Sequence, residues 1–400
     1  MHYTRDEIKE YIEQEDVKFI RLAFCDLNGR MKNMSISPEE LDRAFSEGIS
    51  FDASAVENFG QERRTDLALM PISKTLNVLP WRPSRGKVVR MFCNIKYLDG
   101  TPYEFDTRQI LQNAVKEAKE MGLTVQIGTE FEFYLFKTDE NGDPTDEPFD
   151  KAGYMDVAPE DKGENIRREI CLTLTEMGIS PECSMHLDGP GQNEIDFRYA
   201  DAITAADNAM NFVSVVKAAA LHNGLYADFT PKPIANKPGN GLHINMSVVG
   251  KDEENYNERF MAGVMEHIRE ITAFLNTRPE SYNRLGEHTA PKFVSWSREN
   301  RSQLLRVPAN RNENKRFELR SPDPCLNPYL AFAMLIYAGL DGIKNNLELP
   351  EAINVNLSDA DDELTSKLNQ LPGTFEEAKK LAKESEFVNS VLNKELVSLL

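Results

Sequence analysis

One stretch places two acidic side chains in what otherwise reads as a buried strand, at residues 128–136 (GTEFEFYLF). Successive side chains of a strand alternate between its faces, so Glu130 and Glu132 share one face while Phe131 and Phe133 share the other. An unpaired charge is costly to bury, and two like charges side by side repel each other. If the shared face is buried, its carboxylates need protons or a cation, and a divalent metal is the simplest partner.

Three later segments repeat this alternation, at residues 193–199, 241–247 and 316–320. Their polar positions carry acids, arginines and one histidine, namely Glu194, Asp196, Arg198, His243, Asn245, Ser247, Arg316, Glu318 and Arg320. Oxygen-rich ligands suit Mg²⁺ or Mn²⁺ better than zinc, and arginine forks bind phosphate and carboxylate groups. The set fits metal-assisted phosphoryl transfer, although an ordinary sheet with one solvated face shows the same alternation. No Walker A or dinucleotide motif is visible, so any nucleotide would be held by this sheet.

Composition excludes several classes of protein. The 400 residues are 40% hydrophobic and 28% charged, typical of a globular chain with room for two domains. The net charge of -19 argues against nucleic acid or an anionic membrane as the main partner. The first residues lack a signal-peptide layout, no apolar run approaches the ~20 residues that span a bilayer, and the five cysteines form no C-x-x-C pair. We therefore expect a cytoplasmic protein with reduced cysteines.

The order of patterns predicts a domain over residues 1–100 and a larger one over residues 101–400, divided at a turn-rich junction. In the first part we expect a helix at residues 4–15, strands at residues 17–24, 31–36 and 87–97, and a functional loop at residues 48–64. In the second part we expect helices at residues 107–121, 164–177, 205–223 and 327–344, and within residues 374–400.

Short motifs in consistent order resemble those of type I glutamine synthetases. Residues 128–133 (GTEFEF) are similar to the family's G-x-E-x-E-F, residues 190–194 (PGQNE) to P-G-Q-x-E and residues 240–243 (NGLH) to S-G-M-H. Further similarity lies in residues 300–308 (NRSQLLRVP), 317–324 (FELRSPDP) and 327–330 (NPYL). The resemblance runs from about Val17 to the last predicted helix.

This resemblance implies an α+β protein: an N-terminal β-grasp domain and a catalytic domain whose curved antiparallel sheet is backed by helices. It also implies an ATP-dependent ligase, in which ATP phosphorylates the γ-carboxylate of glutamate and ammonia displaces phosphate from the γ-glutamyl phosphate. The implied partners are glutamate, ATP and ammonia or another amine, with Mg²⁺ or Mn²⁺ as cofactor. A homo-oligomer with active sites between subunits is expected, either a hexameric ring or a dodecamer, since the chain stops short of the family's usual C-terminal tail.

The resemblance also implies roles for individual residues. In catalysis, Asp52 of a neighbouring subunit would bind and deprotonate ammonium, and Arg301 would face the transferring phosphoryl group. The implied metal ligands are Glu130, His243 and Glu318 for the metal that bridges the ATP phosphates, and Glu132 and Glu194 for a second metal. The implied glutamate-binding residues are Gly239, Arg284, Arg301 and Arg320. The implied nucleotide contacts are Glu182, Asn245, Ser247 and Arg306.

Three positions depart from the family pattern. Leu187 replaces a carboxylate ligand of the second metal, and Asp188 is expected to take over only by a register shift, because the next residue of a strand faces the other way. Thr289 stands where the family's flap has a glutamate, with Glu287 nearby, and Pro238 replaces an asparagine that helps to hold glutamate. The departures leave two alternatives open: a ligase for a larger amine, or a catalytically weak paralogue with a regulatory role.

Overall fold

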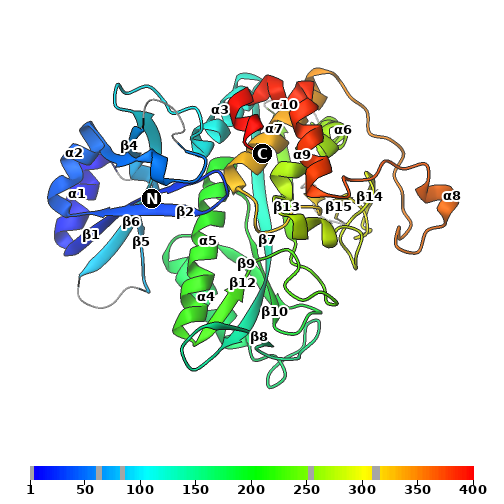
Figure 1. The fold of residues 1–400 in the computed structure, drawn as a ribbon, viewed down its shortest axis with the longest axis horizontal. Helices are drawn as coiled ribbons and strands as arrows, with labels where there is room; N and C mark the ends of the chain where they lie inside the picture. The colour runs from blue at the N-terminus through cyan, green and yellow to red at the C-terminus, as the bar shows by residue number, and fades with distance from the viewer. Residues whose placement is uncertain (1–3, 60–64, 82–85, 251–255, 309–315) are drawn as a thin grey trace.

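Two β-sheets, each beside its own buried apolar cluster, form the frame of the molecule (Figure 1). The computed structural model describes residues 4–59, 65–81, 86–250, 256–308 and 316–400. The smaller sheet is formed by the N-terminal part of the chain. The larger sheet and most of the helices follow the connection from strand β6 (Lys87–Tyr97) to helix α3 (Thr107–Glu120).

The N-terminal sheet has six strands in the order β2-β1-β6-β4-β3, with β5 paired to β6. Besides β6, its strands are β1 (Val17–Cys25), β2 (Met31–Ile36), β3 (Ile49–Asp52), β4 (Asp66–Pro71) and β5 (Asn77–Val78). Helices α1 (Arg5–Gln14) and α2 (Leu41–Ser46) and the 3-10 helices Pro38–Glu40, Ala53–Ala55 and Ser73–Thr75 accompany it. The parallel pairing of β1 with β6, beside antiparallel neighbours, gives the mixed sheet expected of a β-grasp domain.

The expected functional loop at residues 48–64 is more regular than its polar sequence suggests. Its start pairs as β3 with β4, because Ile49 is buried and lies opposite Leu69. A 3-10 helix then begins at Ala53, and residues 60–64 lie outside the described part of the chain. The loop therefore begins as the edge of the sheet.

Strand β7 (Leu123–Thr138) is the longest strand of the larger, ten-stranded sheet. Seven of the strands follow one another in the order β14-β15-β16-β13-β7-β10-β9. Strands β8, β11 and β12 also pair with β7. The other strands are β8 (Pro144–Pro148), β9 (Pro181–His186), β10 (Gln192–Phe197), β11 (Ala200–Asp201), β12 (Leu225–Asp228), β13 (Leu242–Gly250), β14 (Trp296–Arg298), β15 (Leu305–Val307) and β16 (Phe317–Leu319). The sheet is antiparallel as expected, except for the parallel pair of β14 with β15.

Helices cover the apolar face of the larger sheet (Figure 1). Besides α3, the helices of this part of the chain are α4 (Glu164–Glu176), α5 (Ala202–His222), α6 (Asn257–Leu275), α7 (Pro328–Lys344), α8 (Asp362–Thr365), α9 (Phe375–Glu384), α10 (Glu386–Val391) and α11 (Lys394–Ser398), with a 3-10 helix at Pro279–Asn283. Of these, α8 stands apart from the sheet and buries none of its residues. Phe131 of β7 packs on Phe212 of α5, with ring centroids 4.8 Å apart. The apolar half of the predicted strand therefore lies in the core, which leaves its acidic half for the opposite face.

Helices α6 and α7 pack with their backbones unusually close. A Cβ atom at Gly263 would lie 2.1 Å from the carbonyl oxygen of Ala338, and one at Gly342 would lie 2.2 Å from that of Arg259. Both helices need glycine here because any side chain would push them apart.

The C-terminal helices predicted within residues 374–400 form as three short segments. Ser385 ends α9 and caps α10, since its hydroxyl accepts a hydrogen bond from the backbone N–H of Val388. Asn393 caps α11 in the same manner, through the N–H of Glu395. Ser385 and Asn393 are both favoured N-cap residues, and they divide this segment into three helices.

Asp106 joins the two sheets at the start of α3. Its Oδ1 atom accepts from the N–H of Arg108 at 3.1 Å, which caps the helix, and its Oδ2 atom accepts from the N–H of Ile95 in β6 at 2.8 Å. One buried carboxyl group therefore ties the last strand of the first sheet to the first helix beyond it.

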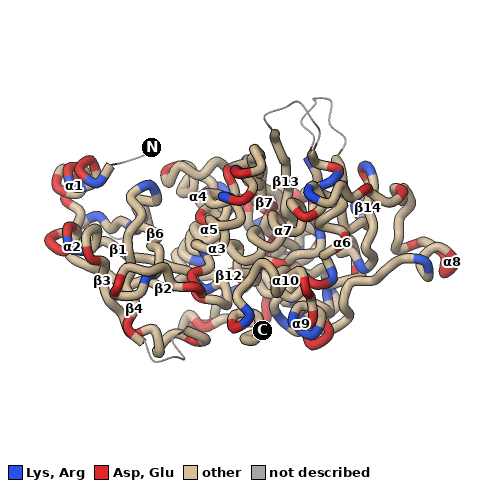
Figure 2. The backbone as a smooth tube through the Cα atoms, turned by 90° about the horizontal axis from the view of Figure 1, so that it is seen from above, with Lys and Arg blue, Asp and Glu red and all other residues tan. Residues whose placement is uncertain are grey.

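Charged side chains lie mainly on the outside of the molecule. Figure 2 shows acidic and basic residues interspersed along outer helices such as α1 and α9. Among the described residues, we find no helix with the length and apolar character needed to span a membrane. All five cysteines are free.

Candidate active site

The polar face of β7 lies between β13 and β10, which supply the expected histidine and further acids. The register places Glu130 opposite both His243 and Asp196, and Glu132 opposite Glu194. On the far side of β13, Asn245 lies opposite Glu318 of β16. The four polar faces predicted from the sequence therefore merge into one surface, which we call the funnel face.

Glu130 is held as an anion by its protein neighbours. Its carboxylate lies 3.1 Å from His243 Nδ1 and accepts a hydrogen bond from Asn245 Nδ2 at 2.8 Å. Burial alone would raise the pKa of this carboxyl, but the histidine, the amide and the positive charge of Arg320 lower the pKa to about 2. Glu130 is thus ready to bind a cation.

The surroundings of Glu194 and Asp196 instead favour the neutral, protonated form of each carboxyl group. Burial, together with the negative charges of Glu132 and Asp196, raises the pKa of Glu194 well above its usual range. Burial and the charge of Glu130 raise the pKa of Asp196 to about 7. Since these acids share one surface, a cation among them is what would let all of them ionise together.

One group on the funnel face has the composition of a metal site. Ligand atoms of Glu130, Glu194 and His243 lie within 4.8 Å of one another. Carboxylate oxygens with a single imidazole fit a hard divalent cation. The group combines ligands that the family resemblance divides between two metals, so the two expected sites adjoin each other.

Glu318 already has strong partners in the protein. It is fully buried, and it accepts hydrogen bonds from Arg306 at 2.5 Å and from Arg320. Burial favours its neutral form, but the positive charges of Arg320 and His243 outweigh burial and lower its pKa. Its Oε1 atom lies 3.7 Å from His243 Nδ1, which places it at the edge of the metal group.

A cavity of about 370 Å³, which we call the arginine cavity, opens beside Glu132. The four residues expected to bind glutamate all line it: Gly239, Arg284, Arg301 and Arg320. Arg284 is buried and donates to the backbone oxygens of Ser321 and Pro322. A Cβ atom at Gly239 would lie 2.8 Å from Arg284 Cγ, so a side chain there would displace the arginine. The cavity thus gathers three arginines beside the acids of the sheet.

The flap at the mouth of this cavity carries both residues discussed from the sequence. Thr289 and Glu287 line the cavity, and the Glu287 carboxylate is paired with the ammonium group of Lys232. The Lys232 side chain is 7% exposed, whereas that of Glu287 is 55% exposed. The hydrogen bond from Lys232 lowers the pKa of Glu287. Glu287 is thus an anion held at the cavity by a buried lysine.

Leu187 and Asp188 both line the arginine cavity, which corrects one expectation. The alternation rule predicted that Asp188 would face away unless the register shifted. Strand β9 ends at His186, and its pairing with β10 finishes with the hydrogen bond from Leu187 N–H to the carbonyl of Gln192 at 2.9 Å. Because the chain turns immediately afterwards, strand alternation no longer applies to Asp188.

Asp52 is not brought to the funnel face of its own chain. It ends β3 in the N-terminal sheet, is exposed, and accepts a hydrogen bond from Ser54 N–H at 2.9 Å. It does not line the arginine cavity, so a role there requires Asp52 of another chain.

The expected nucleotide contacts lie on three strands of the larger sheet, β13, β15 and β9. Asn245 and Ser247 stand two residues apart on β13, and Arg306 lies on β15 opposite Glu318. Glu182 lies on β9 at a β-bulge, where the register shifts between the Asp196–Cys183 and Phe197–Pro181 pairs. The bulge changes the side on which a strand residue points.

Residue-by-residue inspection of the sequence missed two groups that hold Glu132. The amide of Gln192 donates to Glu132 Oε2 at 3.4 Å and to the carbonyl of Gly239 at 3.1 Å. The backbone N–H of Gly241 donates to the same Glu132 oxygen at 2.7 Å. The motifs PGQNE and NGLH contain both residues, so these motifs were the available signal.

A second group of possible ligands, Asp150, Asp161 and His186, is already paired within the protein. His186 Nε2 lies 2.9 Å from Asp150, and Asp161 forms an ion pair with Arg167. These partners satisfy the group without a metal, so we regard it as structural.

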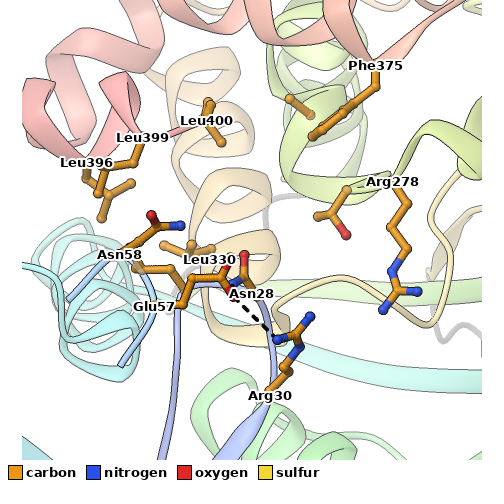
Figure 3. A pocket seen from close by; sticks show the side chains of 13 residues that line it. Asn28, Arg30, Glu57, Asn58, Arg278, Leu330, Phe375, Leu396, Leu399 and Leu400 are labelled. Carbon is orange, nitrogen blue, oxygen red and sulfur yellow. Dashed lines mark hydrogen bonds and ion pairs between the residues drawn. The ribbon is translucent and has the colours of Figure 1, made fainter. Parts of the chain in front are cut away.

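A second cavity of about 370 Å³ lies where the turn between β1 and β2 meets the C-terminal helices (Figure 3). Arg30 and Glu57 form an ion pair at 3.4 Å across it, while Arg278 and Phe375 line its far side. It contains none of the site residues expected from the sequence.

Comparison with known families accounts for nearly the whole chain. Residues 104–399 match the family described as glutamine synthetase, catalytic domain, and residues 16–97 match glutamine synthetase, beta-Grasp domain. The glutamine synthetase of Clostridium saccharobutylicum is 43% identical over 405 residues, which cover 98% of this chain and 91% of the relative. That of Methanosarcina mazei is 41% identical over 411 residues, covering 99% and 92%.

Solved structures share the fold. A complex of GmaS with ADP superposes with a TM-score of 0.89 at 25% identity and covers 100% of this chain and 94% of its own. The glutamine synthetase of Plasmodium falciparum superposes with a TM-score of 0.85 at 23% identity and covers 99% and 94%. The second likeness shows the fold alone.

Proposed function

This chain belongs to the glutamine synthetase family, and from that premise we propose that it is an ATP-dependent ligase that joins ammonia to the γ-carboxylate of glutamate. The observation that carries the proposal is the arginine cavity beside the Glu130, Glu194 and His243 group. A phosphoryl acceptor and a metal-bound nucleotide need these two environments next to each other.

We assign the protein's own groups as follows. Arg284 and Arg320 bind the carboxylates of glutamate, and Gly239 leaves room for Arg284. Arg301 neutralises charge on the phosphoryl group during transfer. The metal ligands are Glu130, His243 and Glu318 on one side and Glu132 with Glu194 on the other. Glu182, Asn245, Ser247 and Arg306 contact the nucleotide.

We propose Mg²⁺ or Mn²⁺ as the divalent cation, because the ligands are mainly carboxylate oxygens. When bound, such a cation neutralises the phosphates of ATP and polarises the transferring group. The chain's own residues supply the remaining chemistry: the arginines orient glutamate, and His243, Asn245 and Arg320 keep Glu130 ionised.

The ammonium site is proposed to be completed by a neighbouring chain. Asp52 is exposed and lies outside the arginine cavity of its own chain, so a homo-oligomer with sites between subunits would bring it into place. We propose a hexameric ring or a dodecamer of such rings. The carboxylate would attract ammonium and accept its proton before the amine attacks the acyl phosphate.

Two further assignments belong to the proposal. We divide the chain into a β-grasp domain at residues 1–100 and a catalytic domain at residues 101–400. We also place the enzyme in the cytoplasm, which supplies ATP and glutamate and keeps cysteines reduced, in accord with the free cysteines.

The relatives favour ammonia as the acceptor over the alternatives of a larger amine or a weak regulatory paralogue. Relatives 41% and 43% identical to nearly all of this chain are named glutamine synthetase. The ion pair of Lys232 with Glu287 also supplies the flap with a carboxylate that Thr289 cannot provide.

The test is phosphate release from ATP with Mg²⁺ and glutamate, in the presence of ammonium, methylamine, ethanolamine or putrescine, with the amide product identified. We expect ammonium to give the fastest release and glutamine as product. If no amine stimulates release, the ligase proposal fails. If methylamine or a larger amine is preferred, the ligase stands and ammonia as acceptor is wrong.

A further inference from the structure

The four residues that follow Asp188 form a defined turn. Gln192 N–H donates to the carbonyl of Gly189 at 3.0 Å, which closes a four-residue turn. Pro190 occupies its second position, and Gly191, with φ at 71°, occupies its third. Proline followed by a left-handed glycine is the sequence that a type II turn requires. The residues before the turn are therefore held in place from this side.

A buried hydrogen-bond network holds the other side. His186 lies between two acceptors, with Nε2 at 2.9 Å from Asp150 and Nδ1 at 2.6 Å from the carbonyl oxygen of Leu187. Asp150 also accepts from the N–H of Gly191 at 2.9 Å. His186 and Asp150 are buried, so the network fixes Leu187 and Gly191 to the same buried carboxylate.

The turn packs directly against the side chain of Tyr134. A Cβ atom at Gly189 would lie 1.9 Å from the Tyr134 hydroxyl, so only glycine permits this approach. Tyr134 stands two residues from Glu132 on β7, so the turn that follows Asp188 is packed against the strand that carries Glu132.

Glu194 is a buried carboxylate that the described part of the protein leaves without a hydrogen-bonding partner. It is 9% exposed and lines the arginine cavity, yet among the described residues no hydrogen bond reaches its carboxylate. Leu187 lines the same cavity and offers no ligand atom. Leu187 thus leaves a position beside Glu132 and Glu194 without a ligand atom, and Asp188 lines the cavity at the next position.

We propose that Asp188 is the third carboxylate of the second metal site and acts with Glu132 and Glu194 in place of the ligand that Leu187 cannot provide. This inference rests on the proposed function, because it assigns a residue to the second divalent cation of that reaction. The exchange of one acid for its neighbour is possible because the strand ends at His186.

The test counts bound metal without measuring turnover. Mn²⁺ is titrated into the wild-type protein, Asp188→Asn and the double variant Leu187→Glu/Asp188→Asn, and free Mn²⁺ is followed by electron paramagnetic resonance. We expect two Mn²⁺ ions per wild-type chain. Asp188→Asn should weaken one of them at least about tenfold, in the range seen when groups around a metal are removed. The double variant should restore it, because Leu187→Glu returns a carboxylate to the cavity.

Asp146→Asn, an exposed aspartate of β8 with the same change of charge, is the matched control and should bind as the wild type does. Asp188 is exposed, so its variant should unfold at the wild-type temperature. Unchanged Mn²⁺ binding by Asp188→Asn overturns the proposal, whether or not the KM for glutamate rises, and so does a single Mn²⁺ on the wild-type chain. Failure of the proposed function would appear separately, as absent glutamine synthesis by the wild-type protein.

Discussion

Single residues of the funnel face differ in where their partners come from. Glu130 and Glu318 obtain partners from the protein, through His243, Arg306 and Arg320. Arg301, in contrast, is exposed at the arginine cavity and has no ion pair among the described residues. A charge that the fold leaves without a counter-ion at a cavity is available to a ligand.

Replacing Arg301 by alanine should therefore damage catalysis and leave stability unchanged. We expect kcat to fall at least about 100-fold, the usual cost of removing one group that stabilises transition-state charge. Steady-state kinetics with thermal unfolding measures both effects. Arg298→Ala, an exposed arginine of β14, is the control and should remain active. A variant of Arg301 with wild-type kcat would remove this residue from the mechanism.

The residues on regular strands were the ones that the sequence could place. Period-two alternation put Glu130, Glu132 and Glu194 on one face, and the register confirms that they face each other. Asp188 was misplaced because the rule was carried one residue past the end of a strand. The partnership of Lys232 with Glu287 was also missed, since the two residues are 55 positions apart and no local pattern joins them.

Among the elements, the connection from β6 to α3 joins the two sheets through one buried carboxyl group. Asp106 accepts hydrogen bonds from both elements and is 3% exposed. Burial raises its pKa to about 6, although backbone N–H groups act in the opposite direction. The group that aligns the sheets is thus also sensitive to pH.

The sign of this pH dependence follows from the two pKa values. In the unfolded chain the carboxyl titrates near 3.8, and in the folded protein near 6. Between these values the folded state keeps a proton that the unfolded state has lost, so the contribution of Asp106 to stability should fall as pH rises from about 4 to about 6, by on the order of 3 kcal/mol. Asp106→Asn lacks this contribution, so its Tm difference from the wild type should change across that window and level off above it. The exposed Asp146→Asn should follow the wild type throughout, and equal slopes for Asp106→Asn would show that Asp106 does not couple to folding.

In the whole molecule, the residues expected to form the active site are divided between the two sheets. Asp52 belongs to the N-terminal sheet, whereas Arg301 lines the arginine cavity beside the larger one. From the sequence, Asp52 was expected in an irregular loop, and Arg301 was singled out only through the family motif in residues 300–308. The sequence could not predict that one chain leaves Asp52 outside its own arginine cavity, because that depends on how the two sheets pack.

Subunit mixing tests whether neighbouring chains complete the site. Asp52→Ala and Arg301→Ala should each be inactive alone, since each lacks one half of every site. Coexpressed chains that assemble at random should regain roughly a quarter of wild-type activity, because about one interface in four joins two intact halves. Glutamine synthesis by the purified mixed oligomer is the measurement. A mixture as inactive as its parents would mean that each site is built within a single chain.

Strand β7 pairs with β13 and β12 along one side and with β10, β11 and β8 along the other, and it carries Glu130 and Glu132. Backbone amides bonded in the middle of a sheet open only when the whole domain unfolds, and edges and loops open far earlier. Local fluctuations can therefore loosen the flap or the C-terminal helices many times without moving the two carboxylates. The acids that are costliest to bury stand on the segment that should exchange its amide hydrogens most slowly.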